Sequence, residues 1–296
     1  MTYSAWVEHW KTYTLKLSGL DPKSQRVYID VLDLHVIPVI GETGLGDVRA
    51  THVEMVLSKM ADKGLSPSYR HQAWKAMSKS LKIARRDDLI ARNPMDGVAV
   101  PRGGQKDPVV PTREQVLALI AAAPDARMRA FIATLAYTGT RISEALSIQW
   151  ADVDLEANRI RILKAKGGKP RAVPITAGLR VELVAWRKAQ NAQHLASPVW
   201  LEGSDWVLAS DHGTQWDAHN ARKLFRPIAK DICPGLTPHG LRHATATMLL
   251  EEGVPMKVVS ELLGHSSTRI TSDLYSHVTD RLVKEAGDAL DRALGG

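Results

Sequence analysis

The sequence predicts a mainly α-helical protein of two domains with a small β-hairpin. Capped amphipathic helical patterns fill residues 4–86 and resume at residue 112. Two alternating segments, residues 159–163 and 171–175, carry the clearest strand pattern in the chain. A Pro- and Gly-containing stretch separates the helical regions and predicts an interdomain linker. The expected divisions are a helical domain at 1–100, a linker at 101–111 and a second domain at 112–296.

The composition fits an intracellular protein with an anionic partner. Of the 296 residues, 44% are hydrophobic, which is enough for two folded cores. The formal charge of +7 favours nucleic acid as a partner, although an ordinary basic protein has the same composition. The single cysteine, Cys233, excludes an intrachain disulfide, and the sequence shows neither a signal peptide nor a membrane-spanning run. We therefore expect a cytoplasmic protein without a membrane partner.

Four helices are expected in the first domain, at about residues 4–17, 22–38, 51–63 and 66–86. A proline at the first helical position, after Asp21 and after Ser66, marks two of the starts. Thr51 and Glu54 have the spacing of a capping box and mark a third. The first helix is expected to bury the face that carries Trp6, Trp10, Tyr13 and Leu17.

The fourth helix carries a basic ridge beside an apolar stripe. The stripe recurs at helical spacing and comprises Trp74, Met77, Leu81 and Ala84. The basic residues expected to contact DNA are Arg70, Lys75, Lys79, Lys82 and Arg86. Such a ridge can follow a phosphate backbone, whereas an ordinary solvated helix face gives the same pattern. Between residues 70 and 92, seven Lys or Arg stand against two acids, which favours the DNA contact.

The linker contains Arg102 and Lys106, which are available to DNA phosphates. Joined by it, two basic domains would close around a duplex as a clamp. A plain surface loop is the alternative reading. The linker is favoured because Thr112 and Gln115 open a new helix directly afterwards.

The second domain begins with helices at about residues 112–122 and 126–137, followed by the run TGTRISEAL. Gly139 can end one helix, so Arg141 lies near the N-terminus of the next. A positive charge there opposes the helix dipole, and this local cost suggests a bound anion. Glu144, one turn on, is spaced to hold the guanidinium. A plain intrahelical ion pair worth about 0.2–0.5 kcal/mol is the alternative.

The two alternating segments predict a β-hairpin whose turn, residues 164–169, contains three lysines and two glycines. A hairpin tip can carry a lysine into a DNA groove, but the pattern leaves the function of these lysines open. The glycine motifs of nucleotide-binding loops are absent from the sequence. Further helices are expected at about residues 177–190 and 218–230.

Residues 236–278 bring together the groups that suggest chemistry on a phosphate. His239 and Arg242 lie one helical turn apart, His265 follows an apolar helix, and Tyr275 stands among polar residues. Two cationic side chains and a hydroxyl nucleophile suit a phosphodiester. His239 and His243 also have the spacing of a zinc helix, but the glutamate of that motif is missing and the nearby arginine repels a metal.

These motifs resemble those of the tyrosine recombinases, the family of phage integrases and Xer-type recombinases. TGTRISEAL is similar to the family's first arginine motif, with Thr140 where an apolar residue is more usual. HGLRHATATMLLEEG and LLGHSS are similar to its His-x-x-Arg motif, and Tyr275 follows His265 by ten residues. AKGGKPRAVPI resembles the hairpin that carries the family's lysine, and the match falls on Lys166. The resemblance implies a helical core-binding domain and a catalytic domain that form a clamp on DNA.

The resemblance further implies strand exchange by transesterification, with no metal and no cofactor. Tyr275 is the expected nucleophile, Lys166 the general acid and His239 the general base or a phosphate donor. The expected catalytic set is Arg141, Lys166, His239, Arg242, His265 and Tyr275, with Glu144 orienting an arginine from behind.

Integration or excision of a phage or other mobile element is the role we expect first, and Xer-like dimer resolution second. A non-cutting DNA-binding regulator and a type IB topoisomerase are further alternatives, disfavoured by the complete catalytic set and by the short chain respectively. Expected partners are double-stranded DNA at a specific attachment site, a homotetramer on synapsed DNA and an accessory directionality factor.

The two ends of the chain carry further expectations. The first helix starts near Ser4, so we expect no additional arm-binding domain before it. The amphipathic tail at residues 279–294 resembles the family's tail that docks on a neighbouring protomer. Folding back onto its own domain is the alternative for this tail.

Overall fold

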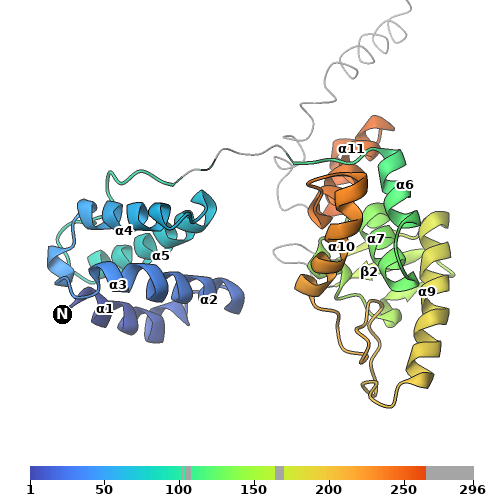
Figure 1. The fold of residues 1–296 in the computed structure, drawn as a ribbon, viewed down its shortest axis with the longest axis horizontal. Coiled ribbons are helices and arrows are strands. Elements are labelled where there is room, and N and C mark those ends of the chain that lie inside the picture. The colour runs from blue at the N-terminus through green and yellow to red at the C-terminus, as the bar shows by residue number, and fades with distance from the viewer. Residues whose placement is uncertain (102, 104–107, 164–169, 265–296) are drawn as a thin grey trace, which may run out of the picture. The chain divides into compact units, whose positions relative to one another are not determined.

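The computed structural model describes residues 1–101, 103, 108–163 and 170–264. The chain divides into two compact units, Met1–Lys106 and Asp107–Gly296 (Figure 1). The described residues are mainly helical with one small antiparallel sheet, which confirms the predicted fold class. In the part of the chain that the structure describes, no helix is long and apolar enough to cross a membrane.

The N-terminal unit is a helical bundle around one apolar core. Its α-helices are α1 (Tyr3–His9), α2 (Pro22–Val31), α3 (Ile37–Ile40), α4 (Ala50–Asp62) and α5 (Pro67–Arg86). The π-helical turns Trp10–Leu15 and Leu32–Val36 and the 3-10 turn Leu45–Asp47 complete the unit. Trp6, Leu32 and Met77 are among the fully buried side chains that hold the helices together. The predicted start of α5 is confirmed, and Ser66 caps it, since Ser66 Oγ accepts the backbone N–H of Tyr69 at 3.2 Å.

Three predicted details of this unit are wrong, each for a local reason. Tyr13 and Leu17 are exposed and Leu15 is buried instead, because the π-helical turn shifts the face set by the α-helical period. Pro38 does not end its helix but lies in the first turn of α3, where its missing N–H is tolerated. Helix α4 begins at Ala50, before Thr51, and the Arg49 N–H donates to His52 Nδ1 at 3.1 Å.

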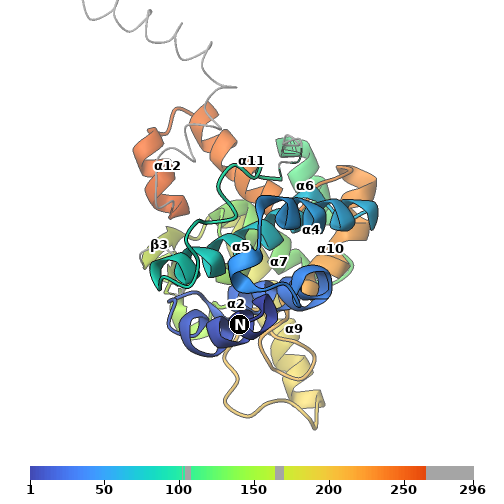
Figure 2. The ribbon, with the colours of Figure 1, turned by 90° about the vertical axis from the view of Figure 1, so that its left-hand side faces the viewer.

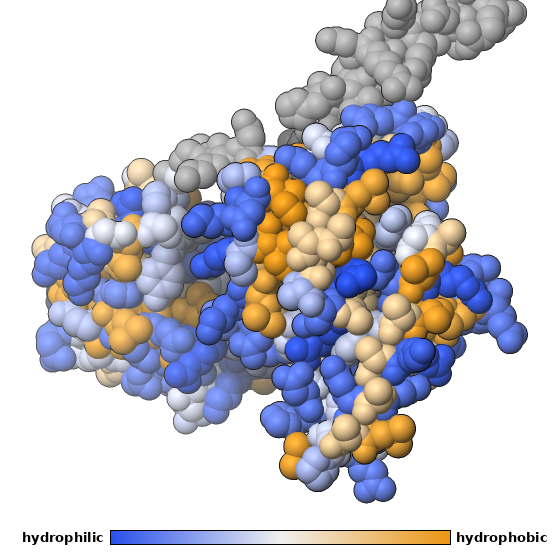
Figure 3. Space-filling model, turned by 45° about the vertical axis from the view of Figure 1, so that its right-hand side comes forward, coloured by the Kyte–Doolittle hydropathy of each residue, from blue (hydrophilic) through white to orange (hydrophobic). Residues whose placement is uncertain are grey.

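The C-terminal unit is built around α7 (Ala126–Thr138), which packs against α9 (Ala177–Ala196), α11 (Pro238–Glu251) and α6 (Arg113–Ala121). Its other helices are α8 (Ile142–Ala145), α10 (Ala218–Ile232), α12 (Met256–Leu263) and a 3-10 turn at Trp150–Asp152. Phe131, Leu135 and Trp186 lie in its core. Figure 3 shows hydrophobic residues exposed on this unit, and the exposed large apolar side chains include Leu117, Val184 and Leu224.

The sheet of this unit has three antiparallel strands in the order β1 (Val153–Asp154), β2 (Arg159–Ile162) and β3 (Arg171–Pro174). Ile160 pairs with Val173 and Ile162 with Arg171, so the predicted hairpin is confirmed in its strands. The predicted turn lies outside the described residues. Strand β1 was not predicted because two residues are too few for an alternating pattern.

Three chain segments meet where α7 ends. Figure 2 shows α12 close to β3 with α11 beside it, and α12 contacts both elements. Helix α7 ends at Gly139 with φ +61°, a left-handed conformation that turns the chain directly into α8. A Cβ at Gly139 would collide with the Leu263 side chain of α12, so glycine is required here for space as well.

Candidate functional site

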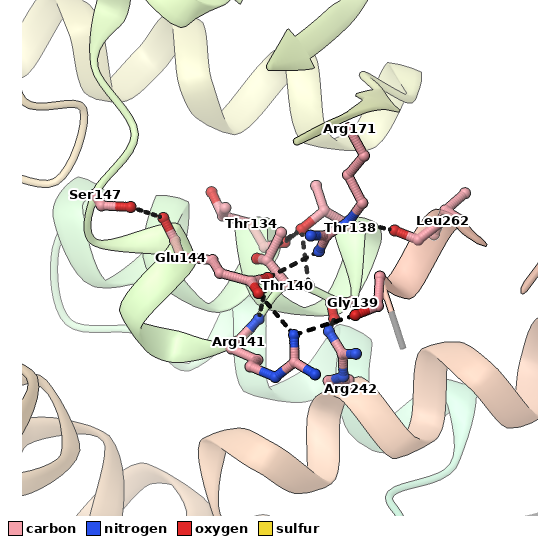
Figure 4. A network of polar contacts seen from close by, with 11 residues as sticks. Thr134, Thr138, Gly139, Thr140, Arg141, Glu144, Ser147, Arg171, Arg242 and Leu262 are labelled. Atoms are coloured by element: carbon pink, nitrogen blue, oxygen red, sulfur yellow. Dashed lines mark hydrogen bonds and ion pairs between the residues drawn. The ribbon is translucent and has the colours of Figure 1, made fainter. Parts of the chain in front are cut away.

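Glu144 is a fully buried carboxylate held between two arginines (Figure 4). Its Oε1 accepts Arg141 Nη1 at 2.8 Å, and its Oε2 accepts Arg171 Nη2 at 2.8 Å. Oε2 also accepts the backbone N–H of Arg141 at 3.1 Å. Burial by itself raises the pKa of Glu144, but the hydrogen bonds from Arg171 and Arg141 outweigh it and lower the pKa below its ordinary value. Glu144 is therefore charged at neutral pH.

Arg242, the arginine of the His-x-x-Arg motif, lies near this carboxylate. Arg242 is 2% exposed, and its Nη1 donates to the Gly139 carbonyl at 2.8 Å. Among the described residues, its Nη2 is buried without a hydrogen-bond partner. Burial first, and then the charge of Arg141, lower the pKa of Arg242 to about 9. Arg242 remains a cation at neutral pH, with donor capacity left for an anion.

We call Arg141, Glu144, Arg171 and Arg242 the arginine cluster. Three guanidinium charges stand against one carboxylate charge, so the cluster is positive overall. Guanidinium groups pair with phosphate oxygens through two parallel hydrogen bonds and stay charged when partly buried. Arg141, with 27% of its side chain exposed, is the member most open to a ligand. The arrangement therefore suits an anion that carries several oxygens.

Two histidines of α11 flank Arg242 in the sequence. The rings of His239 and His243 are perpendicular, with their centroids 4.6 Å apart. Burial and then the charges of Arg242 and Arg141 lower the pKa of His239. Burial, His239 and Arg242 lower the pKa of His243. Both imidazoles are neutral at pH 7, and a neutral imidazole can accept a proton or donate one hydrogen bond.

A buried threonine network supports the α7–α8 junction. Thr138 Oγ1 donates to the Thr134 carbonyl at 2.5 Å and lies 2.9 Å from Thr140 Oγ1. Thr245 of α11 donates to the Ala136 carbonyl at 2.7 Å. Thr140, which departs from the usual apolar residue, is therefore accommodated by a hydrogen-bond partner rather than left unpaired.

Arg171 was missed as a site residue by sequence reasoning. Its side chain is 8% exposed, and its Nε donates to the Leu262 carbonyl at 2.7 Å while Nη2 binds Glu144. The one sequence signal was an arginine at the start of a strand whose alternate residues are buried. That signal names no partner, because Glu144 and Leu262 lie 27 and 91 residues away.

Of the predicted catalytic set, the structure brings Arg141, His239 and Arg242 to the region between α8 and α11, together with Glu144, which was predicted to orient an arginine. Lys166, His265 and Tyr275 lie outside the described residues, as do the tail and the linker residues Arg102 and Lys106.

The predicted basic ridge lies on α5 of the N-terminal unit. Lys79, Lys82 and Arg86 are exposed, whereas Arg70 and Lys75 are half-buried. Lys79 Nζ lies 6.0 Å from the centre of the Tyr28 ring, and Arg86 Nε pairs with Asp87 at 2.7 Å. Lys79 and Lys82 are thus the exposed lysines of the ridge, and neither has an ion pair among the described residues.

The chain matches the model of the phage integrase family over residues 110–281. It is 30% identical to "Tyrosine recombinase XerA" of Thermococcus kodakarensis, over 95% of this chain and 93% of that protein. It is 29% identical to "Integrase" of Streptomyces ambofaciens, over 91% of this chain and 74% of that protein.

Solved structures share the fold at low sequence identity. A lambda integrase dimer bound to a core site superposes with a TM-score of 0.75 and 17% identity, over 91% of this chain and 97% of that one. The Tn1549 transposon integrase in complex with transposon right end DNA superposes with a TM-score of 0.77 and 19% identity, over the full length of both chains.

Proposed function

The chain belongs to the phage integrase family, the tyrosine recombinases, and from this membership we propose a catalytic role for each residue of its site. The activity of the family is site-specific recombination by transesterification on a tyrosine. We assign the nucleophile to Tyr275, whose phenolic oxygen attacks a DNA phosphorus. The products are a 3′-phosphotyrosine and a free 5′-hydroxyl. The covalent ester keeps the energy of the broken bond, so religation by a partner strand needs no ATP.

The observation that supports this proposal best is the arginine cluster. Arg141 and Arg242 would each bind a non-bridging oxygen of the scissile phosphate, because both keep donors beyond their protein contacts. Their charges would stabilise the pentavalent transition state, in which the equatorial oxygens gain negative charge. Glu144 has no free oxygen and would act by holding Arg141 rather than by contacting DNA.

Proton transfers complete the assignment. His239, neutral at pH 7, would accept the proton of Tyr275 or donate a hydrogen bond to the phosphate. Lys166 would protonate the leaving 5′-oxygen, and His265 would add a further hydrogen bond. These three roles rest on family resemblance as well as on chemistry.

We propose integration or excision of a mobile element as the biological role, with Xer-like dimer resolution as the second candidate. The relatives include both an integrase and Xer recombinases, so the comparisons support the chemistry for either role. We further propose that the N-terminal unit holds the DNA through its basic ridge and linker, that four copies act on synapsed sites in the cytoplasm, and that the tail docks on a neighbour. An accessory directionality factor is the partner that an excision role would add.

A nicked suicide substrate tests the chemistry. The cognate site is nicked just 3′ of the scissile phosphate, so that the released fragment diffuses away and the covalent adduct accumulates. The wild-type protein should form an adduct on a 3′-phosphate in the presence of EDTA, and Tyr275→Phe should form none. Binding without any adduct in the wild type would instead favour the non-cutting regulator. An undiminished adduct in Tyr275→Phe would overturn the assignment of the nucleophile.

A further inference from the structure

We propose that Arg171 is a positioning residue that fixes the guanidinium of Arg141 through Glu144. The inference rests on the proposed function, in which Arg141 neutralises charge on the scissile phosphate. Arg171 would touch neither DNA nor the reacting atoms. Its side chain is 8% exposed, its Nη2 donates to Glu144 and its Nε to the Leu262 carbonyl. Its Nη1 is buried and has no hydrogen-bond partner among the described residues.

Arg171 fixes the orientation of the Glu144 carboxylate. Without Arg171, Glu144 Oε2 would keep only the backbone N–H of Arg141 at 3.1 Å, and the carboxylate could rotate. With Arg171 Nη2 bound to Oε2 at 2.8 Å, the other oxygen has one position in which to accept Arg141 Nη1. Among the described residues, the side-chain hydrogen bonds of Arg141 are made by Nη1, to Glu144 and, at 3.4 Å, to the Gly264 carbonyl. Its remaining guanidinium nitrogens thereby keep a fixed direction for a ligand.

Arg171 and Arg141 also bind the backbone at the C-terminal end of α12. Arg171 Nε donates to the Leu262 carbonyl, and Arg141 binds the Gly264 carbonyl two residues later. Gly264 lies so close to Arg171 that a Cβ at this position would approach Arg171 Nη1 to 2.7 Å. The φ of Gly264 is +69°, in the left-handed region. The residues that bind Glu144 therefore also hold the chain immediately before His265. On its other side, Arg171 opens β3 directly after the segment that contains Lys166.

This positioning role requires arginine rather than lysine at position 171. One planar guanidinium donates from Nε to a carbonyl and from Nη2 to a carboxylate, and a lysine ammonium cannot reproduce this pair of directions. A role limited to neutralising Glu144 would be met by either residue. A positioning role needs the fork, so Arg171→Lys should be impaired even though it keeps the charge.

The test compares adduct formation on two suicide substrates. One has the normal scissile phosphate, and the other has a methyl group in place of a non-bridging oxygen, tested as separate diastereomers. The methyl group removes the charge that Arg141 neutralises. Arg171→Met should slow adduct formation on the normal phosphate by about 100-fold with unchanged DNA affinity. On the diastereomer that removes the oxygen facing Arg141, the ratio of wild-type to variant rates should fall towards one.

Arg127→Met is the matched control. Arg127 is a largely buried arginine of the same unit, paired with Asp211 at 2.7 Å and stacked on Trp216, and it does not contact the arginine cluster. Its rate ratio should be equal on both substrates. If Arg171→Met does not fold, Arg171→Lys is measured instead. Its rate of adduct formation on the normal phosphate should fall less, and its ratio of wild-type to variant rates should again fall towards one on the methyl substrate.

The outcomes separate this inference from the proposed function. An equal loss on both substrates, or no loss, would overturn the role of Arg171 while leaving the recombinase assignment standing. A wild-type protein that forms no adduct on the normal substrate would overturn the proposed function itself.

Discussion

Replacing Glu144 by glutamine removes one buried negative charge and almost no volume. In the wild type, this carboxylate receives hydrogen bonds from two guanidinium groups, and a third, Arg242, lies close enough for its pKa to be affected by Glu144. The amide of Glu144→Gln has one acceptor oxygen, so Arg141 and Arg171 cannot both keep their bonds. Its NH₂ group would instead point a donor at an arginine. The buried guanidinium of Arg171 and the half-buried guanidinium of Arg141 are thus left without a counter-ion.

The magnitude follows from the burial of the pair. Breaking a buried ion pair by removing one partner costs about 3–5 kcal/mol, because the other charge stays buried and uncompensated. We expect about 3 kcal/mol, the lower end, because 27% of the Arg141 side chain is exposed and water can solvate part of its charge. The effect depends on pH with a defined sign. The folded-state pKa of Glu144 is lowered, so its stabilisation is present above the ordinary value of 4.5 and is lost as pH falls through the folded pKa.

The assay is urea unfolding of the full-length protein at pH 7 and at several pH values below 4.5, with Glu182→Gln as the control. Glu182 pairs with Arg129 at 3.7 Å, and 43% of the Arg129 side chain is exposed, so its loss should cost less than about 1 kcal/mol. The difference between wild type and Glu144→Gln should be largest at pH 7 and shrink in acid. A loss at pH 7 no larger than that of Glu182→Gln would refute the argument that the arginine cluster depends on this carboxylate.

Three further predictions concern the proposed catalytic and DNA-binding residues. Arg242→Met should abolish adduct formation yet unfold at the same or a higher temperature, since an incompletely paired buried cation is replaced by an apolar side chain; a lower unfolding temperature would contradict this. Lys166→Ala should cleave slowly and recover on a 5′-phosphorothiolate substrate, whose leaving group needs no proton, and absence of recovery would remove the general-acid role. Lys79→Ala with Lys82→Ala should reduce the slope of log binding constant against log salt by about 1–2, as measured by fluorescence anisotropy, with Lys188→Ala on α9 as the control. An unchanged slope would make the ridge an ordinary solvated face.

The helices and the hairpin could be predicted because their signals are local. Ser66 and Thr112 cap the helices that follow them, and the residues of β2 and β3 alternate over a few positions. Each of these features depends on neighbours within four residues, so a cap residue or a short alternating pattern is enough to predict it. The π-helical turn at Trp10–Leu15 escaped prediction because it changes that period without a distinctive residue type.

The contacts of the candidate site also differ in whether their residues are close together in the sequence. The pairing of Arg141 with Glu144, three residues apart, and the order of the motifs that identify the family could be predicted from the sequence. The full burial of Glu144 depends on the packing of the folded chain, and so does the contact of Arg171 with its second oxygen and with the end of α12. The physical reason is that a charge selects its partner by distance and desolvation after the chain has packed. Residues 27 and 91 positions apart carry no periodic signal of that contact.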